Sequence, residues 1–103
     1  MTVELLHIDE CPNSNDAAER VKTALDALGH PDEEVRMRLV GSAAEMAGTA
    51  FAGSPTITVD GVDIFPEGAP AGDLACRIYR TPAGFAGLPT VEQIQDALGQ
   101  RGF

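Results

Sequence analysis

The sequence predicts a single α/β domain with the element order β-α-β-α-β-β-α and a four-stranded mixed sheet that has helices on both faces. A short apolar run at 2–8 is followed by an amphipathic stretch long enough to cross over to a second, parallel strand. Two further apolar runs flank Asp60-Gly61, which is a strong two-residue hairpin signal. Because 103 residues suffice for one modest core, we expect one domain over 1–103.

The first strand and the first helix follow from apolar spacing. Thr2–Ile8 is mostly apolar and predicts a largely buried strand. From Pro12 to Leu28, apolar residues recur every three or four positions and predict a helix packed on the sheet. Pro12 suits the first helical position, and Gly29 suits the end.

The next two elements are a strand and a short helix. Glu34–Val40 alternates with period two, so we expect a strand with one covered face. Ser42 and Glu45 have the spacing of a capping box, which predicts a short helix that ends near Ala50.

The second half predicts a hairpin, a long loop and a final helix. Thr56–Val59 and Val62–Phe65 are the expected hairpin strands. The stretch 66–89 is rich in Gly, Ala and Pro, with an apolar island at 74–79, and predicts a long loop over the candidate active edge. Thr90-Val91-Glu92-Gln93 then predicts a capping box and a helix with a buried stripe.

The composition bears on partners and compartment. Sixteen acidic and seven basic side chains give a formal net charge of -9, which argues against nucleic-acid binding. We expect no membrane partner, because no apolar stretch approaches the length that spans a bilayer. The N-terminus also lacks a secretory pattern, so a cytoplasmic protein is expected, whose two cysteines are thiols or redox partners.

Cys11 lies at the predicted junction between the first strand and the first helix. Backbone N–H groups and the helix dipole favour the thiolate at such a junction. The carboxylates of Asp9, Glu10 and Asp16 are close in sequence and oppose it. The alternative interpretation of Cys11 is a small buried hydrophobic side chain.

Two motifs resemble the thioredoxin-like superfamily. Cys11-Pro12 follows the first strand, and Ser54-Pro55-Thr56 immediately precedes the third. The resemblance covers about 1–65 and the final helix. Within this superfamily, the chain is most similar to small bacterial proteins of the thioredoxin family. Its resemblance to proteins labelled alkylmercury-lyase-like is weaker. The superfamily resemblance implies a thioredoxin-like fold, a cis-proline at Pro55 that faces the redox cysteine, and a substrate edge formed by four residues: Pro12, Ser54, Pro55 and Thr56.

Ser14 departs from the pattern of dithiol thioredoxins, which carry Cys-x-x-Cys. Cys11 therefore has no local disulfide partner, although a Cys-x-x-Ser site can still form a mixed disulfide with a small thiol. The Ser14 hydroxyl could donate a hydrogen bond to the thiolate, or it could cap the helix. Both interpretations stay open.

Cys76 is the second thiol of interest. The predicted topology brings Pro55 and both ends of the 66–89 loop to the edge where Cys11 sits. A Cys11–Cys76 disulfide would close a loop of roughly 65 residues, worth about 4 kcal/mol. The alternatives for Cys76 are a resolving thiol, a second soft-metal ligand, or a core cysteine within the apolar island.

Two functional hypotheses follow. The first is a thiol–disulfide oxidoreductase in which Cys11 is the nucleophile and Cys76 or glutathione resolves the intermediate. Under this hypothesis we expect no bound cofactor or metal. The expected partner is a protein or a small molecule that carries a thiol or a disulfide. The second is a non-catalytic module that binds a protein partner or a soft metal such as mercury, copper or zinc. His7 could tune the thiol or simply satisfy a local hydrogen bond. Arg77, Tyr79 and Arg80 could receive an anion or balance nearby carboxylates.

Overall fold

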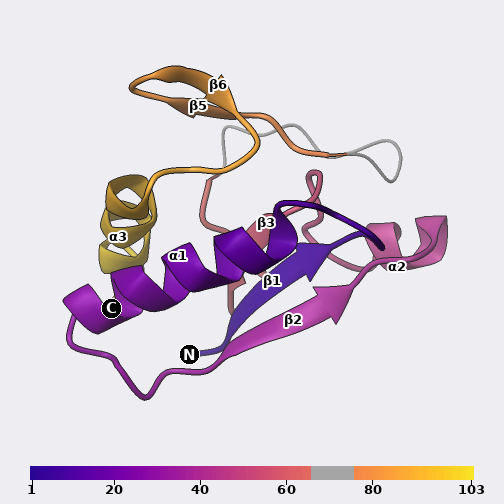
Figure 1. Ribbon diagram of the computed structural model, residues 1–103. Helices are drawn as coiled ribbons and strands as arrows, with labels where there is room; N and C mark the ends of the chain where they lie inside the picture. Colours follow the sequence, from indigo (N-terminus) through magenta and orange to yellow (C-terminus); the bar gives the residue numbers. More distant parts are fainter. Residues whose placement is uncertain (66–75) are drawn as a thin grey trace.

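The computed structural model describes residues 1–65 and 76–103 (Figure 1). Its elements, in chain order, are β1 (Val3–His7), α1 (Ser14–Ala27), β2 (Val35–Leu39), α2 (Ala43–Ala47), β3 (Thr56–Val59), β4 (Val62–Asp63), β5 (Tyr79–Thr81), β6 (Gly84–Ala86) and α3 (Val91–Gly99).

The first four strands form one mixed sheet in the order β2-β1-β3-β4. β1 pairs in parallel with β2 and antiparallel with β3, which in turn pairs antiparallel with β4. Asp60 and Gly61 form the β3–β4 turn with positive φ values of 52° and 82°, as a tight hairpin turn requires. The predicted α/β class and the four-stranded mixed sheet are confirmed.

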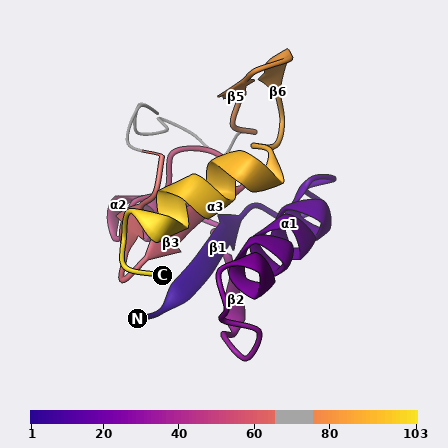
Figure 2. The ribbon, with the colours of Figure 1, turned by 90° about the vertical axis from the view of Figure 1, so that its left-hand side faces the viewer.

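The two faces of the sheet have separate apolar clusters. On one face, Val3, Leu5 and Ile57 pack with the buried stripes of α1 and α3. Those two helices lie side by side across the sheet in Figures 1 and 2. On the other face, Leu6 packs with Phe51, and Met46 of α2 lies against them. Helices therefore cover both faces, as expected.

Strand β2 is more exposed than its alternating sequence predicts. Met37 and Leu39 should have occupied a covered face, yet they are 42% and 50% exposed. Arg36 and Arg38, on the opposite face, are exposed as well. The covered face is therefore limited to Val35, which packs against the core beneath α1 and α3, whereas neither apolar cluster of the described residues includes Met37 or Leu39.

The region 66–89 was predicted as a loop, and this prediction was wrong for its second half. β5 and β6 pair antiparallel there, with Arg80 opposite Phe85. The Thr81 hydroxyl closes the turn by donating to the carbonyl of Gly84, whose φ is 114°. Figure 2 shows this hairpin apart from the main sheet, beyond the end to which β1 points. Residues 66–75 lie outside the described part.

Capping hydrogen bonds mark where helices α2 and α3 begin. The Ser42 hydroxyl accepts a hydrogen bond from the Glu45 N–H at 3.2 Å and begins α2, which ends at Ala47 instead of near Ala50. Thr90 and Gln93 form the predicted capping box of α3. For α1, by contrast, the expected start at Pro12 was wrong, because the helix begins at Ser14 after the N-cap residue Asn13.

Candidate functional site

The Cys11 loop joins the end of β1 to the start of α1. β1 ends at His7, and Glu10 turns the chain with a φ of 57°. Cys11 is partly exposed, so the interpretation as a buried hydrophobic side chain was wrong. It precedes the N-cap residue Asn13 by two positions. Cys11 therefore lies before the first turn of α1 and outside the helix, two residues further from its start than a helix beginning at Pro12 would place it.

Ser14 has a role that neither interpretation predicted. Its side chain is buried, and its hydroxyl donates to the Cys11 carbonyl oxygen at 3.1 Å. Helix α1 has no side-chain capping bond, so Ser14 is not its cap. Pro12 is exposed beside Cys11, outside the helix. Ser14 therefore fixes the backbone of Cys11, because its hydroxyl hydrogen is directed at the carbonyl oxygen of that residue.

Ser54 connects the Cys11 loop to the segment that precedes β3. Its hydroxyl accepts a hydrogen bond from the Ile8 N–H at 3.0 Å, and the side chain is fully buried. The Ser54–Pro55 peptide bond is cis. The carboxyl end of β1 and the amino end of β3 are thus joined directly at one edge of the sheet.

Thr56 and Pro55 are also buried in this edge. The Thr56 hydroxyl donates to the Gly53 carbonyl and accepts from the Ala52 N–H, so it closes the turn before β3. Ser54, Pro55 and Thr56, expected at a substrate edge, therefore make their contacts within the protein. Their observed role is to position the neighbouring chain segments.

Cys76 lies against the same edge. Its backbone forms an isolated parallel bridge with Ser54, and the next residue, Arg77, donates its N–H to the Ser54 carbonyl at 2.9 Å. Cys76 is exposed, so the core-cysteine interpretation was wrong. Both cysteines are free thiols. Ser54 thus contacts both thiol-bearing segments, one through its hydroxyl and the other through its carbonyl.

Gly53 makes this close approach feasible. A Cβ atom at Gly53 would lie 2.7 Å from the Arg77 Cβ and 2.8 Å from its Cα. The φ of Gly53 is 114°, a conformation that side-chain-bearing residues rarely adopt. Only glycine lets the segment after Cys76 pack on this turn.

A buried network holds the Cys76 segment in place. The Arg77 guanidinium forms an ion pair with Asp63 at 2.8 Å and donates to the Phe65 carbonyl at 2.7 Å. It also lies 4.6 Å from the centre of the Tyr79 ring. Tyr79 in turn donates its phenolic hydrogen to the Pro55 carbonyl. Of the two alternatives for Arg77, anion binding and charge balance, the structure supports charge balance.

Burial raises the pKa of the Tyr79 phenol, and the nearby Arg77 charge offsets only part of that effect. The phenol therefore stays protonated and available as a donor to Pro55 over the physiological range. Sequence reasoning did not foresee this network, because apolar patterning would turn Ile78 inward and Arg77 outward, whereas the structure exposes Ile78 and buries Arg77. Arg77 and Tyr79 are buried between exposed neighbours, as in an extended segment with one inward face.

Other candidates are not part of this arrangement. The Nδ1 atom of His7 lies 3.1 Å from the Ile8 carbonyl, which is the satisfied strand histidine that was expected. Within 1–65 and 76–103, no three His, Cys, Asp or Glu side chains are grouped to hold a metal ion. The described helices also include none long and apolar enough to cross a bilayer.

Fold and site together define a class: an α/β protein whose two thiol-bearing segments meet at one edge of a mixed sheet, on either side of a buried Ser-Pro turn. No family model matches the chain, and neither a curated protein nor a solved structure shows significant similarity to it.

Proposed function

We propose that this protein is a thiol–disulfide oxidoreductase of the thioredoxin-like fold, with Cys11 as the nucleophile and Cys76 as the resolving thiol. The bridge between Cys76 and Ser54 carries the proposal, because it brings an exposed second thiol to the edge that holds the Cys11 loop. This second thiol takes the place of the cysteine that the Cys-x-x-Ser sequence lacks.

The topology supports the fold proposal. The resemblance implies a parallel β-α-β unit followed by an antiparallel hairpin and a helix, with the proline turn entering the third strand. The order β2-β1-β3-β4, with β3 antiparallel to β1, fits that arrangement. The β5–β6 hairpin is an addition between β4 and α3.

In the proposed reaction, the Cys11 thiolate attacks one sulfur of a substrate disulfide. A Cys11–substrate disulfide forms, and the other substrate half leaves as a thiolate that takes up a proton. The Cys76 thiolate then attacks the Cys11 sulfur, which releases the second substrate thiol and leaves a Cys11–Cys76 disulfide. Two molecules of an external thiol, such as glutathione, then reduce this disulfide. The first forms a mixed disulfide with one cysteine and frees the other, and the second attacks that mixed disulfide and leaves as the oxidised, disulfide-linked dimer of the external thiol. Two electrons thus pass from the two thiol molecules to the substrate disulfide.

The test compares Cys11→Ser and Cys76→Ser with the wild type in the reduction of hydroxyethyl disulfide by glutathione. We expect Cys11→Ser to abolish turnover. Cys76→Ser should accumulate the mixed disulfide on Cys11, visible by mass spectrometry of the intact protein. Mild oxidation of the wild-type monomer should consume both thiols. If wild type and Cys11→Ser reduce the disulfide equally slowly, catalysis by Cys11 is excluded.

A second candidate function is non-catalytic binding of a protein partner on the same scaffold. Ser14 favours it, because its hydroxyl is committed to the Cys11 carbonyl and the motif offers no local second thiol. The same assay separates the two functions, since a binding module should show no Cys11-dependent turnover with either glutathione or a dithiol reductant.

A further inference from the structure

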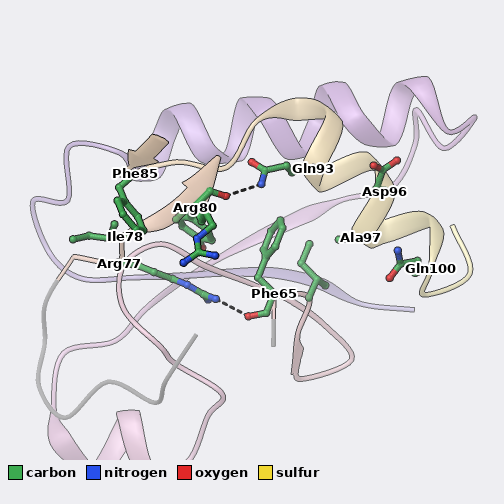
Figure 3. Close-up of a pocket in the computed structure, with 11 residues that line it drawn as sticks. Phe65, Arg77, Ile78, Arg80, Phe85, Gln93, Asp96, Ala97 and Gln100 are labelled. Carbon is green, nitrogen blue, oxygen red and sulfur yellow. Dashed lines mark hydrogen bonds between the residues drawn. The ribbon is translucent and has the colours of Figure 1, made fainter. Parts of the chain in front are cut away.

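An open groove lies between the β5–β6 hairpin and helix α3 (Figure 3). Its volume is about 660 Å³, within the range of protein sites that bind ligands. In Figure 3 the two ends of the groove differ: the apolar side chains Ile78 and Phe85 lie at one end, Arg80 and Phe65 in the middle, and Asp96 and Gln100 at the other end.

Several polar groups that line the groove already have partners. The Arg77 guanidinium is paired with Asp63, and the Tyr79 hydroxyl donates to Pro55. The Gln93 amide donates to the Arg80 carbonyl and accepts from the Thr90 N–H. These groups shape the groove and are not free to bind a ligand.

Three polar side chains of the groove make no hydrogen bond or ion pair within the described residues: Arg80, Asp96 and Gln100. The Arg80 guanidinium carbon lies 5.8 Å from the centre of the Phe85 ring, and Figure 3 shows the side chain between Phe85 and Phe65. Among the described residues the one ion pair is Arg77–Asp63, so Arg80 shares its lack of a carboxylate partner with the other basic side chains and differs from them in lining the groove with an exposed aromatic ring beside it. A ligand carboxylate is its natural complement.

The apolar end of the groove is unusually exposed. Ile78 is 72% exposed and Phe85 is 74% exposed. Cys76, Ile78 and Arg80 alternate with buried residues, so all three belong to the outward face of one extended segment. Phe85 pairs directly with Arg80 and shares that face. Cys76 therefore lies on the same face of this segment as the groove residues Ile78 and Arg80.

We propose that the groove binds an extended peptide segment of a partner protein, with an apolar side chain at Ile78 and Phe85, a carboxylate at Arg80, and hydrogen-bond donors at Asp96 and Gln100. An extended peptide presents these three chemistries in a row, as the groove does. This binding needs neither thiol, so the inference goes beyond the proposed function and stands independently of it.

The test uses two capped peptides, Ac-Phe-Glu-Ala-Lys-NH2 and the charge-swapped Ac-Phe-Lys-Ala-Glu-NH2. Each is titrated by NMR into the full chain carrying Cys11→Ser and Cys76→Ser, which removes thiol chemistry from the measurement. We expect shifts at Ile78, Arg80, Phe85 and Gln100 with a dissociation constant of about 1 mM or below for the first peptide. The swapped peptide should bind about three- to tenfold more weakly, since both charge contacts are reversed.

Arg80→Gln should weaken binding of the first peptide about two- to fivefold, whereas Arg36→Gln on exposed β2 is the matched control and should leave it unchanged. The proposal is overturned if neither peptide shifts groove resonances at about 10 mM, or if both bind equally. It is also overturned if phenylacetate binds as tightly as the peptide, which would identify a small-molecule pocket. Groove shifts that depend on protein concentration alone would instead identify a second copy of the chain as the occupant.

Discussion

Tyr79 donates its phenolic hydrogen to the carbonyl oxygen of Pro55 and so ties the segment after Cys76 to the turn before β3. This hydrogen bond acts together with the backbone bridge from Cys76 to Ser54. The exposed thiol is therefore carried by a segment whose inward side chains are held to the sheet edge.

The Tyr79 phenol should make stability fall at high pH. Burial raises its pKa in the folded state, so above about pH 10 the unfolded chain loses this proton first. The contribution of the Tyr79 phenol to the free energy of unfolding is fully present below that pH. It declines above that pH by up to about 1.4 kcal/mol per pH unit. Urea unfolding across this range should show the decline in wild type and not in Tyr79→Phe. Parallel curves for the two proteins would contradict the assignment.

Loss of the Asp63 charge should destabilise the fold strongly. The side chains of Arg77 and Asp63 are only 5% and 13% exposed, so Asp63→Asn leaves a buried guanidinium without its counter-ion. We expect a loss of about 3 kcal/mol in the free energy of unfolding. Asp60→Asn, at the exposed hairpin turn, is the control and should cost less than about 1 kcal/mol. An equal loss in both variants would argue against the buried pair.

Gly53 and Gly61 should respond differently to alanine. Both have positive φ, but a Cβ at Gly61 meets no atom of the described residues within 4 Å, whereas one at Gly53 collides with Arg77. We expect Gly61→Ala to cost about 1–2 kcal/mol from backbone conformation alone. Gly53→Ala should cost clearly more and should increase alkylation of Cys76 by loosening its segment. Similar losses of stability and unchanged alkylation would contradict the close packing.

Gln93 should anchor the added hairpin as well as cap α3. Thr90→Ala and Gln93→Ala both break the capping box and should each cost about 1 kcal/mol. Only Gln93→Ala also removes the hydrogen bond to the Arg80 carbonyl. Hydrogen exchange of the β5–β6 amides should therefore accelerate more in Gln93→Ala, and equal acceleration in both variants would assign the effect to the cap alone.

Most of the main sheet could be predicted because its signals are local. The crossover helix, the Asp60-Gly61 turn and the capping residues Ser42 and Thr90 each specify a neighbouring element. The exposure of β2 could not be predicted, because period-two alternation is the same for an edge strand and a central one. The β5–β6 hairpin was missed because its strands are short and lie among Gly, Ala and Pro residues.

The candidate site divides in the same way. Cys11 and Pro55 could be selected from their places at predicted strand ends, and topology predicted that the loop containing Cys76 starts and ends at that edge. The roles of Asp63, Tyr79 and Gly53 could not be predicted from the sequence, because each depends on contacts between segments that are distant in sequence. Ser14 was misjudged because the position of the helix start decides which group its hydroxyl reaches.

The open edge of the sheet has a consequence for how two molecules meet. If two β2 strands paired antiparallel about Met37, Arg36 of one copy would lie opposite Arg38 of the other, and like charges placed so are destabilising. Unpaired edge strands otherwise invite association between sheets. The arginines that alternate with Met37 along this exposed strand therefore disfavour edge-to-edge association of two molecules.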